Sequence, residues 1–168
     1  PYYERFMNAL PTVEALAAAP EETLLKLWEG LGYYNLVRNM QKAAQKIEEE
    51  YAGKFPENYE EIKALPGIGN YTAGAISSFA YGIPKPAVDG NVLRVVSRLL
   101  ASDADIMKAS VRTKIENAIE PVIPEDAASD FNQGLIELGA IVCVPNGEAK
   151  CEICPLTGIC EAKRLGIQ

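Results

Sequence analysis

The residues with the clearest capacity for chemistry are four cysteines with the spacing C-x7-C-x2-C-x5-C: Cys143, Cys151, Cys154 and Cys160. Two disulfides are one interpretation, but nothing in the sequence suggests a secreted chain. Four unrelated buried cysteines are another, and their crowding argues against it. A metal site with four thiolate ligands fits best, either zinc or an iron–sulfur cluster. Because four-cysteine zinc sites usually pair two short C-x2-4-C units and only one is present, the spacing favours an iron–sulfur cluster.

A second candidate site is the stretch LPGIGNYTAGA, where a proline and two glycines interrupt a helical pattern. Glycine allows the backbone to take positive φ and to approach another molecule closely. At the start of the next helix, the amides of Gly69, Asn70 and Tyr71 would be unpaired and could bind an anion such as a phosphate. The alternative is an ordinary turn between two helices that binds nothing.

A third candidate is the carboxylate of Asp89 in the segment AVDGNVLRVVSRL. An aspartate directly before a helix most often serves as its N-cap. It could also be an ionised group in a cleft between two lobes, where it would stabilise a cationic sugar while a bond at the anomeric carbon breaks. Both roles stay open at this point.

The elements that position these residues are all expected to be helices. Apolar residues recur at helical spacing in almost every segment, and no alternating strand pattern persists. The predicted fold class is therefore all-α, with Asn58 and Ser110 as helix caps. A helical lobe over residues 1–84 would contain the hairpin at 65–72, and a cysteine-bearing lobe would span 85–168. Helices are expected within the segments 21–32, 34–51, 58–65, 70–82, 90–101, 110–123 and 126–143.

The overall charge sets a limit on nucleic-acid binding. The net charge is −7, from 16 basic and 23 acidic residues, which disfavours phosphate contacts unless positive charge gathers locally. Many of the acids cluster between residues 48 and 61, whereas Arg94 and Arg98 follow the glycine-rich region. No apolar run approaches the ~20 residues that span a bilayer, and no signal peptide opens the chain. We therefore expect a cytoplasmic protein without a membrane partner. Because the first residue is Pro1, we also expect a piece of a longer protein.

Taken in order, LPGIGNYTAGAI, VDGNVLRVVSR and the clustered cysteines resemble the helix-hairpin-helix DNA glycosylases, in particular the MutY adenine glycosylases, which are related to endonuclease III. The segments WEGLGYYNLVRN, FNQGLIELGAIVC and CPLTGIC also resemble MutY segments, so the resemblance covers essentially the whole chain. It implies a base-excision enzyme that removes adenine mispaired with 8-oxoguanine or guanine from double-stranded DNA. We expect a monomer in the bacterial cytosol, associated with the nucleoid through DNA binding.

The resemblance assigns the hairpin to DNA binding. In this family the hairpin amides hold a backbone phosphate, often with a monovalent or divalent cation on the hairpin carbonyls, while a base is flipped out. Endonuclease III-like enzymes carry a lysine where this chain has Tyr71, so no Schiff base can form there and efficient strand cleavage is not expected. The implied DNA-binding residues are Leu65, Pro66, Gly67, Ile68, Gly69, Asn70 and Thr72.

The resemblance also implies the catalytic and recognition residues. Asp89 would stay ionised and stabilise the oxocarbenium-like sugar, Asn91 would orient a water or the acid, and Tyr71 would stand beside the sugar. Gln133 would border the adenine pocket, and Leu31 and Tyr33 would contact 8-oxoguanine. The alternative for the segment GLGYY, which contains Leu31 and Tyr33, is a group of core aromatic residues after a helix stop. The implied metal group is a [4Fe–4S] cluster on Cys143, Cys151, Cys154 and Cys160.

The chain departs from the family pattern in its cysteine spacing and at its ends. The usual spacing is C-x6-C-x2-C-x5-C, and the extra residue in VPNGEAK is expected to bulge outward. The family glutamate that protonates the leaving adenine lies in a helix that would precede Pro1. A C-terminal lesion-recognition domain is also absent from the sequence.

The missing glutamate predicts that these 168 residues excise adenine far too slowly for repair. A positioned general acid is worth about 10²–10⁴-fold, the chain has no histidine to replace it, and tyrosine is too weak an acid. A single-turnover assay should compare this chain with the same chain extended at its N-terminus, called the extended protein below. Equal rates would place the acid within these residues and contradict the mechanism.

Two other functions stay open from the sequence. An endonuclease III-type glycosylase and lyase for oxidised pyrimidines would form a covalent adduct with DNA in a borohydride trapping assay. A non-catalytic DNA-binding module would not need the charge of Asp89.

Overall fold

The structure is a computed structural model that describes all residues from 1 to 168, and every regular element in it is helical. The predicted all-α fold class is therefore confirmed. The chain divides into two compact units, Pro1–Gly69 and Asn70–Gln168, and each is described by itself. The expected pair of lobes, 1–84 and 85–168, stays a prediction. No helix has both the length and the apolar character that crossing a membrane requires.

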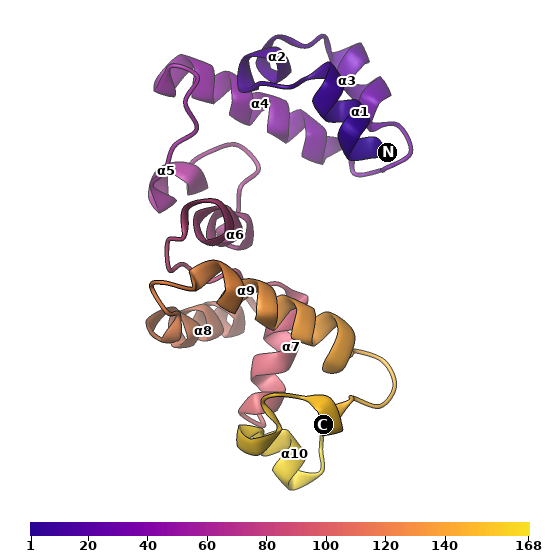
Figure 1. Ribbon diagram of the computed structural model, residues 1–168, viewed down its shortest axis with the longest axis vertical. Helices are drawn as coiled ribbons and strands as arrows, with labels where there is room; N and C mark the ends of the chain where they lie inside the picture. Colours follow the sequence, from indigo (N-terminus) through magenta and orange to yellow (C-terminus); the bar gives the residue numbers. More distant parts are fainter. The chain divides into compact units, whose positions relative to one another are not determined.

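In the first unit, α2 and α3 pack against the long helix α4, and α1 packs against α3. Figure 1 shows α2 lying along α4, and the amide of Gln41 on α4 donates to the carbonyls of Leu16 and Ala19. Small apolar clusters form its core, one around Leu24 and Val37 and another around Ile47. The helices of this unit are α1 (Tyr2–Ala9), α2 (Val13–Ala18), α3 (Glu21–Trp28), α4 (Tyr34–Tyr51) and α5 (Tyr59–Lys63).

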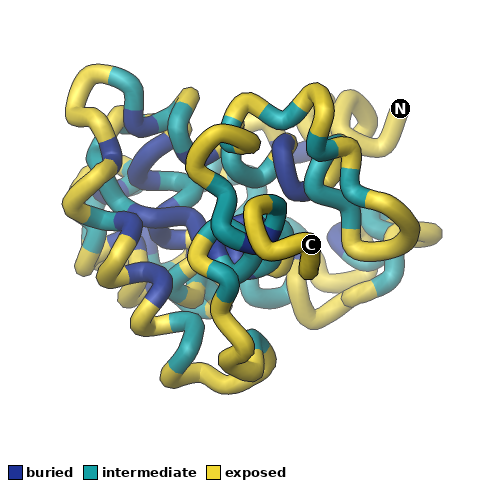
Figure 2. The backbone as a smooth tube through the Cα atoms, turned by 90° about the horizontal axis from the view of Figure 1, so that it is seen from below, coloured by how far each residue is buried: buried dark blue, intermediate teal, exposed yellow.

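The second unit is built around α7, whose Val92, Leu93 and Val96 pack with Ile115 and Ile119 of α8. Buried residues occur in both units, and the two chain ends are exposed (Figure 2). The elements of the second unit are α6 (Asn70–Tyr81), α7 (Gly90–Leu99), α8 (Ala109–Ile119), η1 (Glu120–Val122), α9 (Ala128–Glu137), η2 (Leu138–Val142), η3 (Cys151–Ile153), η4 (Thr157–Ile159) and α10 (Glu161–Leu165).

Of the two residues that the sequence predicts as helix N-caps, Asn58 caps its helix and Ser110 does not. The Asn58 side chain accepts hydrogen bonds from the amides of Glu60 and Glu61, as an N-cap does. The prediction that Ser110 caps α8 is wrong, because the helix begins at Ala109 and Lys108 occupies the cap position. The backbone amide of Lys108 already donates to the carbonyl of Asp105, so the chain turns before Ser110 is reached.

Candidate functional site

The glycine turn between α5 and α6 owes its shape to one of its two glycines. Gly67 has φ +78, and a Cβ there would lie 2.5 Å from the Cβ of Asn39. Gly69 has no positive φ, and a Cβ there would meet nothing within 4 Å. Of the two properties that glycine allows, Gly67 supplies the positive φ that the turn requires, whereas Gly69 leaves space through which another molecule can approach the backbone.

The remaining hairpin residues divide by exposure. Leu65 is buried and its carbonyl accepts from the amide of Ile68, which holds the turn closed at 3.2 Å. Tyr71 and Thr72 are exposed at the start of α6, and Pro66 and Ile68 are half-buried. The first amides of any helix lack partners within that helix, so the start of α6 offers donors on an exposed surface.

Asp89 is the N-cap of α7, and both of its carboxylate oxygens are hydrogen-bonded. Its Oδ1 accepts from the amide of Val92 at 2.9 Å, and its Oδ2 accepts from Nδ2 of Asn91 at 2.8 Å. The structure thus brings together two residues that the sequence analysis had placed in one site. The half-buried carboxylate is held in one orientation by these two donors.

Arg94 extends this arrangement toward the cysteines, a role that sequence reasoning missed. Its guanidinium donates to Oδ1 of Asn91 at 2.8 Å, to the carbonyl of Gly139 at 2.7 Å and to the carbonyl of Cys143 at 2.8 Å. A Cβ on Gly139 would lie 2.5 Å from the Cβ of Asn91, so this glycine allows η2 to approach α7. The only sequence signal was an arginine one turn after Asn91.

The segment before Asp89 is fixed by buried groups that the sequence analysis also missed. The side chain of Asn132, only 2% exposed, accepts from the amide of Ala87 at 2.9 Å and donates to the carbonyl of Lys85 at 3.0 Å. A Cβ on Gly74 would lie 1.9 Å from the carbonyl oxygen of Pro86. The backbone leading to Asp89 therefore lies directly on α6, where no side chain larger than hydrogen fits.

The four cysteines are free thiols that line one pocket of the second unit. Arg98 ties two of them to α7, because its Nη1 donates to Sγ of Cys143 at 3.2 Å and its carbonyl accepts from Sγ of Cys160 at 3.6 Å. Burial raises the pKa of the Cys151 thiol, Lys163 opposes this, and the other three cysteines add to it. No three acidic, cysteine or histidine side chains converge on a point where they could hold a single metal ion. A shared pocket with four thiols fits a group that offers several points of attachment.

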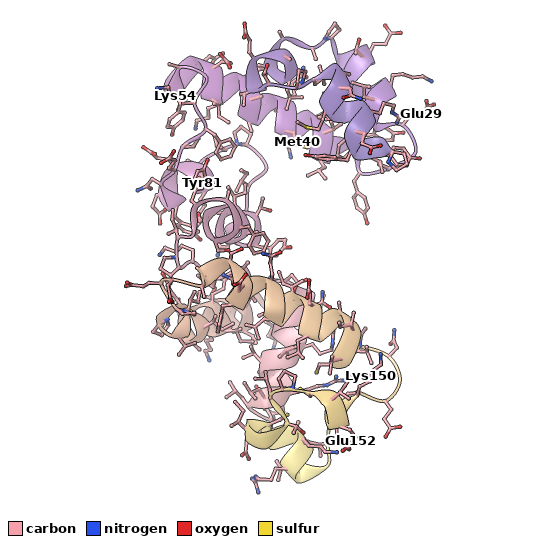
Figure 3. All side chains as sticks on the ribbon, in the orientation of Figure 1. Glu29, Met40, Lys54, Tyr81, Lys150 and Glu152 are labelled. Atoms are coloured by element: carbon pink, nitrogen blue, oxygen red, sulfur yellow. The ribbon has the colours of Figure 1, made fainter.

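The extra residue of the cysteine spacing falls in a loop that projects outward. Residues 145–148 are exposed, and the amide of Lys150 donates to the carbonyl of Val142 at 3.0 Å, which closes the loop behind them. Figure 3 labels Lys150 and Glu152, which are the sequence neighbours of Cys151. An added residue in this exposed loop would lie in solvent, where it would not disturb the cysteine pocket.

The expected recognition residues lie on exposed parts of both units. Tyr33 is 88% exposed with φ 48, an uncommon backbone conformation for a residue with a side chain. The indole of Trp28 donates to the carbonyl of Gly32 at 2.8 Å and holds the turn that carries Leu31, itself 42% exposed. The alternative of core packing is wrong for Leu31 and Tyr33. Gln133 is exposed on α9 of the second unit and donates to Oγ of Ser129 at 2.8 Å.

Comparison with known proteins finds curated relatives that are named adenine DNA glycosylases. The chain is 38% identical over 162 residues to the adenine DNA glycosylase of Buchnera aphidicola subsp. Baizongia pistaciae, covering 96% of this chain and 45% of that protein. It is 40% identical over 164 residues to the adenine DNA glycosylase of Homo sapiens, covering 97% of this chain and 30% of that protein. The chain thus spans less than half the length of these curated relatives.

Solved structures with the same fold include a thermostable thymine-DNA glycosylase, with 26% identity, a TM-score of 0.87 and coverage of 98% of this chain and 75% of that one. Another is endonuclease III in a trapped covalent intermediate with DNA, with 28% identity, a TM-score of 0.81 and coverage of 99% and 76%. The family model described as HhH-GPD superfamily base excision DNA repair protein matches residues 1–121. Since this match includes the hairpin, Asp89 and Asn91, the chain belongs to the HhH-GPD superfamily of base excision DNA repair proteins.

Proposed function

We propose that the protein carrying this chain is a monofunctional adenine DNA glycosylase that acts on adenine opposite 8-oxoguanine or guanine in double-stranded DNA. The observation that carries the proposal is the doubly hydrogen-bonded carboxylate of Asp89, in a chain whose curated relatives are named adenine DNA glycosylases. The protein would work as a monomer in the bacterial cytosol, on nucleoid DNA.

In the proposed reaction the bond between adenine and the anomeric carbon breaks, and its electron pair leaves with the base as the base is protonated. The ionised Asp89 would stabilise the positive charge that develops on the sugar, before water adds to the anomeric carbon. Because Asn91 and the amide of Val92 already orient the carboxylate, little rearrangement is needed when that charge appears. Arg94 supports this by fixing the Asn91 side chain.

Tyr71 supports a glycosylase without lyase activity. It stands at the start of α6 and is 39% exposed, so it is accessible from the hairpin surface. A phenol cannot form the Schiff base that a lysine amine forms with the opened sugar. Borohydride treatment during turnover should therefore leave no covalent protein–DNA adduct, and a trapped adduct would support the lyase alternative.

The substrate assignment is tested by single-turnover assays of the extended protein on four matched duplexes. These carry adenine opposite 8-oxoguanine, adenine opposite guanine, adenine opposite thymine, and an oxidised pyrimidine opposite guanine. Adenine release from the first two duplexes alone supports the proposal. Release of the oxidised pyrimidine alone would contradict it.

We propose that the hairpin residues 65–70 and Thr72 bind a DNA phosphate, with a monovalent or divalent cation on the hairpin carbonyls. The exposed start of α6 and the open space beside Gly69 support this assignment. Such a contact carries no sequence information, so it would hold any duplex while Leu31, Tyr33 and Gln133 read the lesion and the adenine.

The two hairpin glycines give a matched pair of variants. Gly69→Val should weaken binding to lesion-containing and undamaged duplexes by the same factor, because it fills the open approach. Its free energy of unfolding should fall by only about 1 kcal/mol or less. Gly67→Val should weaken binding as well, and should lower the free energy of unfolding by about 2 kcal/mol because φ there is +78. Fluorescence anisotropy and urea unfolding measure the two effects. A loss confined to lesion-containing DNA would contradict the assignment.

We propose that Cys143, Cys151, Cys154 and Cys160 hold a [4Fe–4S] cluster. Their shared pocket and the contacts of Arg98 with two of the sulfurs support a single bound group. In a tetrathiolate zinc site the sulfurs would converge to about 3.8 Å from one another, given Zn–S bonds of about 2.3 Å. When bound, the cluster would supply a rigid cross-link for the C-terminal loops.

Protein purified without oxygen should be brown, with broad absorbance near ~400 nm and about four iron atoms per chain. Replacing Cys154 with serine should remove the colour and lower the stability of the second unit. Colourless protein with stoichiometric zinc would contradict the cluster.

A further inference from the structure

Helix α8 carries a buried carboxylate whose position neither the proposed catalysis nor the apolar core explains. Glu116 is only 8% exposed, and its Oε2 accepts a hydrogen bond from Nδ2 of Asn70 at 3.0 Å. Its other oxygen, Oε1, is buried without a hydrogen-bond partner. A carboxylate held in this way is costly for folding, so a reason other than stability is required for its presence.

One helical turn before Glu116, the same helix carries a second polar contact. The Nη1 of Arg112 donates to the carbonyl of Val88, the residue directly before Asp89. Residues four apart share a helix face, so Arg112 and Glu116 reach their partners from one side of α8. Ile115 and Ile119 pack into the core with α7, which fixes α8 to the helix that Asp89 caps.

The contact between Glu116 and Asn70 bears directly on the start of α6. Asparagine side chains near a helix start readily accept hydrogen bonds from backbone amides. If the Asn70 side chain turned toward these amides, it would compete with a phosphate for the same donors. Its hydrogen bond to Glu116 holds the side chain against α8 and leaves the amides to the phosphate.

We propose that Glu116 and Arg112 are positioning residues, which tie the phosphate-binding start of α6 and the turn carrying Asp89 to one helix. Glu116 acts through Asn70 on the binding of the DNA backbone. Arg112 acts through the carbonyl of Val88 on the placement of the catalytic carboxylate. This inference rests on the proposed function and deepens it.

The first test measures binding of the 168-residue chain to an undamaged duplex by fluorescence anisotropy. Glu116→Leu should raise Kd about fivefold, because the freed Asn70 side chain can then compete for the amides. Asn70→Ala and the double variant should both stay within about twofold of the parent chain, because the competing side chain is gone. Glu116→Gln should stay within about twofold of the parent chain, since its amide oxygen can still accept from Asn70. Removal of an exposed acid in the control Glu125→Leu should leave Kd unchanged or lower it.

The sign of the Glu116→Leu effect makes this test decisive. Loss of a negative charge near DNA strengthens binding by simple electrostatics, whereas loss of the positioning contact weakens it. Urea unfolding of each variant gives the fraction of folded protein, and Kd is calculated from the concentration of folded protein alone. Tighter or unchanged binding by Glu116→Leu, or a double variant that binds as weakly as Glu116→Leu, would overturn the inference for Glu116.

The second test uses Arg112→Met in the extended protein, at enzyme concentrations that saturate the duplex. Adenine release should slow about tenfold while Kd for the undamaged duplex stays within about twofold, because the contact acts on the Asp89 turn. An unchanged rate would overturn the role of Arg112. An extended protein that binds no duplex at all would instead overturn the proposed function, and the inference with it.

Discussion

Replacing Asp89 with asparagine should slow adenine release by the extended protein about 10³-fold or more. The positive charge on the sugar appears only as the bond to adenine breaks, so loss of the carboxylate charge raises the barrier without weakening ground-state binding. Asn91 Nδ2 now donates to Oδ2 of Asp89 at 2.8 Å. In the variant, an NH2 group would replace that oxygen when the other oxygen accepts from Val92, and two donors would then face each other. Single-turnover rates on duplex with adenine opposite 8-oxoguanine measure the effect.

This substitution is informative because it spares the cap of α7. Asparagine is as good an N-cap as aspartate, and its oxygen can still accept from the amide of Val92. The free energy of unfolding and Kd for duplex should therefore stay close to those of the parent protein. Undiminished adenine release would refute the catalytic role of Asp89, and would favour a site in which this carboxylate only caps a helix.

Replacing Gly74 with alanine should be among the most damaging single-methyl changes in the chain. The added Cβ would lie 1.9 Å from the carbonyl oxygen of Pro86, which is backbone and cannot rotate away. Either α6 or the segment leading to Asp89 must move, and Asn132 holds that segment through Lys85 and Ala87. We expect the free energy of unfolding to fall by about 3 kcal/mol. Urea unfolding followed by circular dichroism measures it.

Gly134 on α9 provides the matched control for Gly74. A Cβ at Gly134 meets nothing within 4 Å, so alanine there removes only the helix penalty of glycine. Gly134→Ala should raise the free energy of unfolding by about 0.5–1 kcal/mol. Equal effects of the two substitutions would show that the close approach of Gly74 to Pro86 is absent in solution.

Features that depend on neighbouring residues were predictable from the sequence. The bounds of α4 follow from its apolar spacing and from Gly53 after its end, and Asn58 and Asp89 are read as caps from their positions alone. The failure at Ser110 has the same origin, since a competing turn through Asp105 places the cap two residues earlier, at Lys108. The first residue of a helix is decided by small differences in free energy between such competing caps and turns.

The surroundings of Asp89 could not be read from the sequence in this way. Asn132 reaches Lys85 and Ala87 across a separation of more than forty residues, and Arg94 reaches Cys143 across a similar distance. Nothing in the type of either residue indicates these partners, because an asparagine or arginine on a helix is ordinarily solvated. Tertiary packing brings them together, and it also makes Gly74 necessary where α6 meets Pro86 and Gly139 necessary where η2 meets Asn91.

Most side chains that hold the surroundings of Asp89 donate to main-chain carbonyls, and this affects which substitutions would break the hydrogen bonds. Arg94 donates to the carbonyls of Gly139 and Cys143, and Asn132 and Arg112 likewise contact main-chain groups of the segment from Lys85 to Val88. Every residue type carries a main-chain carbonyl, so a substitution at Cys143 or Val88 that keeps the backbone in place leaves the hydrogen bond intact. Gly139 is the exception, because a Cβ there would lie 2.5 Å from the Cβ of Asn91. The other contacts depend on the identity of the donor side chain alone. Statistical searches for pairs of positions that change together would not detect these couplings, although Asp89 depends on them.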